Sequence, residues 1–133
     1  MAYAAATDST AVIEIGYNEN HNRKGYSLVM DFNGGDGDTY ELYGRTGSTT
    51  ASGIDTTYSV GIVKDYHGRN SYSGEFVCVS GSIKDGYSID YCQSPKEKPG
   101  EGARAITASF SIGTSTSRIA FSYDYYVPIA YWH

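Results

Sequence analysis

Short runs of strictly alternating residues, separated by glycine, serine, asparagine and aspartate, extend along almost the whole of this sequence. In residues 11–17, Ile13 and Ile15 fall on one face and Glu14 on the other. A period of two residues is that of a half-buried β-strand. Similar runs recur, and none of them has the 3.6-residue period of a helix; they cover 26–32, 39–45, 58–63, 75–83, 87–93, 105–113 and 118–126. The pattern predicts an all-β protein.

The chain of 133 residues is long enough for one domain with a core and too short for two ordinary ones. We therefore expect a single domain over residues 1–133, built as an antiparallel β-sandwich or closed barrel of about eight to nine short strands. The turn residues 33–38 predict a hairpin between the strands on either side, and Gly113–Thr116 predicts another. Residues 18–25 read as a polar loop. The tail 127–133 reads as an edge strand or extension because Pro128 cannot donate to a sheet.

Fourteen tyrosines accompany only four phenylalanines and one tryptophan. Tyrosine combines an apolar ring with a hydroxyl that needs a hydrogen-bond partner. If the face that carries the aliphatic residues points inward, most of these rings belong to the core, namely Tyr17, Tyr26, Tyr40, Tyr58, Tyr87, Tyr91, Tyr123 and Tyr125. The same alternation leaves five outside, namely Tyr43, Tyr66, Tyr72, Tyr126 and Tyr131.

The two cysteines, Cys78 and Cys92, lie in the runs on either side of Lys84-Asp85-Gly86. A three-residue turn with Gly86 in the left-handed conformation pairs Cys78 with Cys92 and keeps every apolar residue on one face. We therefore expect the two cysteines to lie opposite each other, on the less buried face. Their spacing does not decide whether they form a disulfide or remain as two thiols.

Composition narrows the classes of partner. Ten basic against fifteen acidic residues give a net charge of −5, the wrong sign for a protein that follows nucleic acid phosphates. No apolar segment approaches the ~20 residues of a membrane-spanning helix, and the beginning of the chain as given does not resemble a signal peptide. These features are expected of a cytoplasmic or released protein, without deciding between the two.

One acidic segment has the composition of a calcium loop, which needs several oxygen ligands on a glycine-bent backbone. It offers Asp31, Asn33, Asp36, Asp38 and Glu41. The order of these ligands departs from the EF-hand pattern, and aspartate and glycine are also the usual residues of a solvated turn. Calcium is thus a possible ligand of this segment, with an ordinary hairpin turn as the competing interpretation.

No nucleophile elbow or other catalytic motif occurs, so we expect binding and not catalysis. Planar amides, cations and exposed aromatic rings are the groups that bind sugars, and they concentrate in a set that predicts a glycan or glycoconjugate as ligand: Tyr66, His67, Arg69, Asn70, Tyr72, Tyr126 and Trp132. The sequence therefore predicts a lectin-like protein. The alternative is a toxin component that docks on a lipid surface or a partner through Tyr126, Tyr131 and Trp132. A homodimer through the terminal strand is a further possibility.

Overall fold

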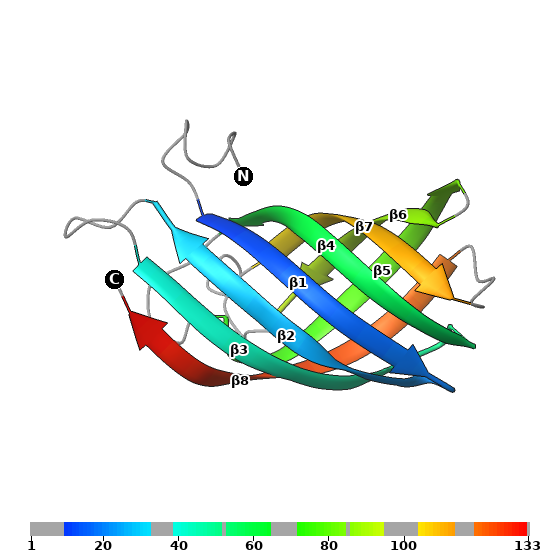
Figure 1. Ribbon diagram of the computed structural model, residues 1–133, viewed down its shortest axis with the longest axis horizontal. Coiled ribbons are helices and arrows are strands. Elements are labelled where there is room, and N and C mark those ends of the chain that lie inside the picture. The colour runs from blue at the N-terminus through cyan, green and yellow to red at the C-terminus, as the bar shows by residue number, and fades with distance from the viewer. Residues whose placement is uncertain are drawn as a thin grey trace.

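The computed structural model describes residues 10–32, 39–51, 53–64, 72–84, 86–94, 104–113 and 119–132. These ranges form eight β-strands: β1 Thr10–Glu19, β2 Asn22–Asp31, β3 Thr39–Thr49, β4 Ile54–Lys64, β5 Gly74–Lys84, β6 Tyr87–Gln93, β7 Arg104–Gly113 and β8 Ile119–Trp132. The strands close into one antiparallel barrel in which they run obliquely to its long axis (Figure 1). The all-β prediction is confirmed, and of the two predicted architectures the closed barrel is correct.

The order of strands around the barrel is β1-β2-β3-β8-β5-β6-β7-β4. The predicted hairpin between β2 and β3 is confirmed, with Asp31 opposite Thr39. The predicted hairpin between β7 and β8 is wrong, because β7 pairs with β4 and β6 while β8 pairs with β3 and β5. A turn signal marks where the chain leaves a strand, but it does not determine which strand the next segment joins.

Two ends of the barrel can be told apart. The short-turn end carries the β1–β2 turn and Gly86; the terminal end is where β1 begins and β8 ends (Figure 1). The predicted loop over residues 18–25 is wrong, because only Asn20 and His21 form the turn, with positive φ angles of 49° and 76°. Such a two-residue turn matches the twist of paired strands. The polar residues around it continue the strands.

Away from the turn, the register of β5 and β6 agrees with the prediction; at the turn it shifts, so that Lys84, predicted as part of a three-residue turn, lies opposite Tyr87. Cys78 lies opposite Cys92 and Val79 opposite Tyr91, and Gly86 has a φ of 82°. The expected edge strand or extension at the C-terminus is confirmed for residues 127–132, which continue β8 and pair with β3 alone, because the pairing of β8 with β5 ends at Tyr126. Pro128 is accommodated at a bulge near Leu42 and Tyr43, one of the positions in a sheet that tolerates the missing N–H group.

The orientation of the two strand faces is the reverse of the prediction. Tyr43, Tyr72 and Tyr126, expected outside, are among the largest fully buried side chains. Six tyrosines expected in the core are exposed on the outside, namely Tyr26, Tyr58, Tyr87, Tyr91, Tyr123 and Tyr125, while Tyr17 and Tyr40 are half-buried. The cysteines, expected on the less buried face, are both buried. Alternation separates two faces of a strand but does not say which of them a closed sheet encloses.

Candidate functional site

The outer wall of the barrel is apolar. Among the described residues, 22 large apolar side chains are exposed, and every strand except β3 contributes to them: Ile13, Ile15, Tyr26, Ile54, Tyr58, Val60, Val77, Val79, Ile83, Tyr87, Ile89, Tyr91, Ile106, Phe110, Ile112, Ile119, Phe121, Tyr123, Tyr125, Val127, Ile129 and Trp132. Soluble monomers rarely expose a contiguous apolar patch of more than a few hundred Å². We call this surface the outer wall.

Charged residues on the outer wall lie close to strand ends. Glu19 is the last residue of β1, Lys24 the third of β2, Lys64 the last of β4, Glu75 the second of β5 and Arg104 the first of β7. Between these positions the outward faces of β4, β5, β6, β7 and β8 carry no charged side chain in the described part of the chain. The central band of the outer wall is therefore apolar.

Tyrosine hydroxyls on the outer wall are directed toward polar groups nearer the ends. The Tyr17 hydroxyl donates to Glu19 at 3.2 Å, and the Tyr91 hydroxyl donates to the Gln93 side chain at 3.4 Å. Each acceptor lies two residues closer to the end of the same strand. The rings thus cover the apolar band while their hydroxyls find partners at its margins, as amphipathic side chains do at a boundary between apolar and aqueous surroundings.

The lumen of the barrel is polar, with a buried network centred on Glu14. One carboxylate oxygen of Glu14 accepts from Ser27 at 2.6 Å, from Tyr126 at 2.9 Å and from Arg45 at 3.2 Å. Glu14 is only 6% exposed and Arg45 only 7%. Three donors on one buried oxygen, one of them cationic, compensate the loss of water around the carboxylate.

A second buried ion pair lies nearer the short-turn end. Arg23 Nε is 3.5 Å from a carboxylate oxygen of Asp124, and the same guanidinium donates to Ser122. Asp124 is fully buried. The two ion pairs bind four strands together from within, because Glu14, Arg23, Arg45 and Asp124 come from β1, β2, β3 and β8.

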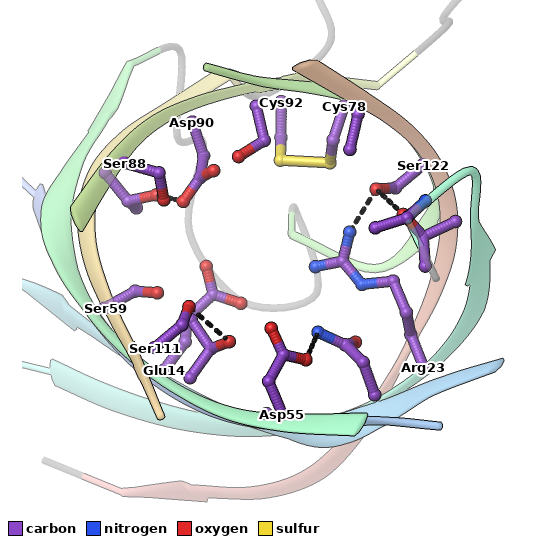
Figure 2. A pocket seen from close by; sticks show the side chains of 18 of the residues that line it. Glu14, Arg23, Asp55, Ser59, Cys78, Ser88, Asp90, Cys92, Ser111 and Ser122 are labelled. Atoms are coloured by element: carbon purple, nitrogen blue, oxygen red, sulfur yellow. Dashed lines mark hydrogen bonds between the residues drawn. A yellow bond between two sulfur atoms is a disulfide. The ribbon is translucent and has the colours of Figure 1, made fainter. Parts of the chain in front are cut away.

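A cavity of about 140 Å³ occupies the lumen beside these ion pairs. Figure 2 shows Asp55, Ser59, Ser88, Asp90 and Ser111 pointing into it from the surrounding strands. Asp55 accepts from the Asn18 amide at 2.8 Å, and Asp90 accepts from Ser109 and, at 3.3 Å, from Thr107. Neither carboxylate forms an ion pair with a described residue. Chemically, this lining suits water and small cations.

The cavity does not continue through the terminal end of the lumen, where an aromatic cluster fills the barrel. Its rings pack edge to face or tilted, with centroids 4.7 Å apart for Tyr72–Phe76, 4.9 Å for Tyr72–Tyr126 and 5.6 Å for Tyr43–Tyr72. Tyr72 lies just before β5, so a residue outside the strands completes this cluster. Burial raises the pKa of the Tyr72 phenol well above its ordinary value, and the neighbouring Tyr126 and Glu14 add to the shift. Tyr72 is therefore neutral at physiological pH.

Of the predicted sugar-binding residues, the three that the structure describes do not share one surface. Tyr72 and Tyr126 are enclosed in the aromatic cluster, so neither ring offers a face to a ligand outside the barrel. Trp132 is exposed on the outer wall, and its ring stacks on Tyr40 with centroids 6.4 Å apart. Tyr66, His67, Arg69 and Asn70 lie outside the described residues. Glycan binding stays a prediction.

Two of the predicted calcium ligands are described, and they lie diagonally opposite each other on β2 and β3 near the terminal end. Asp31 accepts from Thr10 at 3.2 Å, and Glu41 is buried and accepts from the Tyr43 hydroxyl. Asn33, Asp36 and Asp38 lie outside the described residues. Within the described ranges, no group of three or more His, Cys, Asp or Glu side chains is placed to hold a metal ion.

Cys78 and Cys92 form a disulfide that lines the cavity (Figure 2). Their predicted opposition is confirmed. The bond joins β5 to β6 from within the lumen, where both residues are buried.

Sequence reasoning did not recognise the buried charges as a set. Alternation places Glu14 on the face opposite to Ile13 and Ile15 without giving it a role, although a charged residue flanked by isoleucines requires a partner if its face is buried. The partner Arg45 could not be inferred from the sequence, because it lies on β3 and meets Glu14 of β1 over the intervening strand β2.

No protein-family model, curated protein or solved structure matches this chain. Among the described residues, no helix is long and apolar enough to cross a membrane. Proposals about function therefore rest on the geometry of the barrel.

Proposed function

We propose that this protein works as a membrane-embedded barrel, with its outer wall against lipid and its polar lumen shielded from lipid. The observation that carries the proposal is the pairing of 22 exposed large apolar side chains outside with buried ion pairs inside. In water this arrangement leaves apolar area exposed and encloses charge, both of which are unfavourable. In a bilayer the outer wall loses its contact with water.

The length of the strands supports this environment. Seven of the eight strands contain ten to fourteen residues. At about 3.3 Å per residue and a tilt of about 40°, ten residues rise about 25 Å along the barrel axis. That height is close to the apolar band of about 25 Å in membrane barrels.

A lipid environment also requires that the backbone N–H and C=O groups of the sheet be paired within the protein. Each strand has a paired neighbour on both sides over most of its length, so the barrel presents few unpaired backbone groups to hydrocarbon; residues 127–132 of β8 pair with β3 alone. At the short-turn end, Asn20 N donates to Gly53 O at 3.1 Å and Thr50 N donates to Phe121 O at 2.9 Å, which adds backbone pairing beyond the strands.

The side chains inside the lumen support one role for the barrel over others. The aromatic cluster and the two ion pairs occupy the interior, as side chains do in other eight-stranded barrels. We therefore propose a role in binding, as an anchored membrane component, and not in passive flow or catalysis. This proposal keeps the lipid-directed alternative of the sequence analysis and replaces docking through terminal aromatics with contact over the whole outer wall.

A flotation experiment tests the proposal. Protein diluted from urea into zwitterionic vesicles is expected to float with them and to resist extraction at high pH. The double substitution Val60→Asp with Ile89→Asp places charge in the middle of the outer wall and is expected to abolish flotation. The matched double substitution Ile54→Asp with Ile119→Asp changes exposed residues at strand starts and is expected to float.

The same experiment can contradict the proposal. Wild-type protein that stays folded and monomeric in buffer and does not float would count against a lipid environment. A discrete water-soluble oligomer with its outer walls in mutual contact would do so as well, because the apolar surface would then be covered by copies of the chain.

A further inference from the structure

Lys24 is a cation on the outer wall for which the described residues supply no ion pair. Its side chain is exposed, and its ammonium lies 5.7 Å from the centroid of the Tyr17 ring. The nearest carboxylate along β1, that of Glu19, accepts from the Tyr17 hydroxyl instead. At a lipid boundary an ammonium without an anion is costly, and the cost grows with depth.

Lys24 stands at one end of a groove of about 700 Å³ on the outer wall. This volume falls within the range of about 300–1,000 Å³ that is typical of ligand pockets. The bottom of the groove is opened by Gly44, where a side chain would meet Ile129 Cδ1 at 3.3 Å from its Cβ. The groove has an apolar part made by Ile15, Tyr26, Val127 and Ile129, and a polar part made by Lys24, Thr46 and Thr56.

The two parts of the groove match the two parts of one kind of molecule. Lys24 lies opposite Thr46 on the neighbouring strand, and an ammonium with a hydroxyl beside it donates hydrogen bonds to an anionic oxygen. The apolar part excludes water and suits a hydrocarbon chain. We infer that the groove holds one anionic phospholipid, with its phosphate at Lys24 and an acyl chain along Ile15, Tyr26 and Ile129.

This inference rests on the proposed membrane environment and adds selectivity to it. Other cations of the outer wall lack the groove: Lys64 and Arg104 face each other across β4 and β7 at the terminal end. Lys64 therefore serves as the matched control for Lys24.

Native mass spectrometry of protein reconstituted in mixed phosphatidylglycerol and phosphatidylcholine vesicles tests the inference. Wild-type protein is expected to retain one phosphatidylglycerol. Lys24→Gln is expected to lower the ratio of retained phosphatidylglycerol to phosphatidylcholine about tenfold, and Lys64→Gln is expected to leave it unchanged. Gly44→Leu fills the groove and is expected to reduce retention of both lipids, whereas Gly81→Leu, at a position with open space around it, is not.

Equal retention by wild type and Lys24→Gln would overturn the inference, as would retention of added palmitate in place of phospholipid. In these two cases the protein is still in the vesicles, and the proposed function stands. Failure of wild-type protein to enter vesicles of any composition overturns both, so the two failures are distinguishable.

Discussion

The outer wall and the lumen of this barrel use the same strands in opposite ways. Val60, on the outer wall, is 48% exposed, whereas its neighbour Ser59 in the lumen is 8% exposed and hydrogen-bonds to Ser109 at 2.7 Å. The lumen is held by buried hydrogen bonds and ion pairs, whereas the hydrogen bonds of the outer-wall tyrosines Tyr17 and Tyr91 are exposed to the surroundings. The contribution of lumen residues to the free energy of unfolding therefore depends on specific polar partners, whereas that of outer-wall residues depends on the surrounding medium.

The largest expected effect comes from breaking the lumen network at its centre. Glu14→Ala leaves the Arg45 guanidinium buried without its carboxylate, and we expect a loss of about 3–5 kcal/mol in the free energy of unfolding. Urea titration of vesicle-reconstituted protein, followed by tryptophan fluorescence, measures this loss. Glu14→Gln retains an acceptor for Ser27 and Tyr126 and is expected to lose less. Wild-type stability of Glu14→Ala would show that the ion pair has no structural importance.

A charge in the middle of the outer wall gives the next largest effect on stability, and the size of this effect depends on the medium. Val60→Arg is expected to cost about 2–4 kcal/mol in a bilayer, where hydrocarbon cannot solvate the guanidinium. In water the same substitution at an exposed position is expected to change stability by less than about 0.5 kcal/mol. Unfolding titrations in vesicles provide the measurement. If Val60→Arg is harmless in vesicles, the outer wall does not face lipid.

The smallest expected effects on the free energy of unfolding come from removing one tyrosine hydroxyl in the lumen and one on the outer wall. Tyr126→Phe removes a hydroxyl that donates to the Glu14 carboxylate, and we expect a loss of about 1.5 kcal/mol. Tyr58→Phe removes a hydroxyl from the outer wall, where the ring is 49% exposed, and we expect a change of less than about 0.5 kcal/mol. Both values come from the same titration. The reverse ranking would mean that the assignment of tyrosines to lumen and outer wall is incorrect.

The tyrosines also show how far sequence reasoning reached. Alternation correctly separated Tyr58 from Ser59 and Tyr43 from Leu42, so the two faces of each strand were predictable. The assumption that the apolar face is the buried one then placed both faces on the wrong side. Two rings of the predicted sugar site were misplaced for the same reason, since Tyr72 and Tyr126 were expected to be exposed and lie in the aromatic cluster.

The sequence by itself determined the strands, the Cys78–Cys92 pairing and the turn at Gly86, because these depend on local period and turn chemistry. Only the tertiary structure decided the strand order, the meeting of Glu14 with Arg45, and which face is enclosed. These features depend on contacts between residues far apart in the chain. The period of a strand is the same whether its apolar face points into a core or out toward lipid, so closure of the sheet had to make that choice.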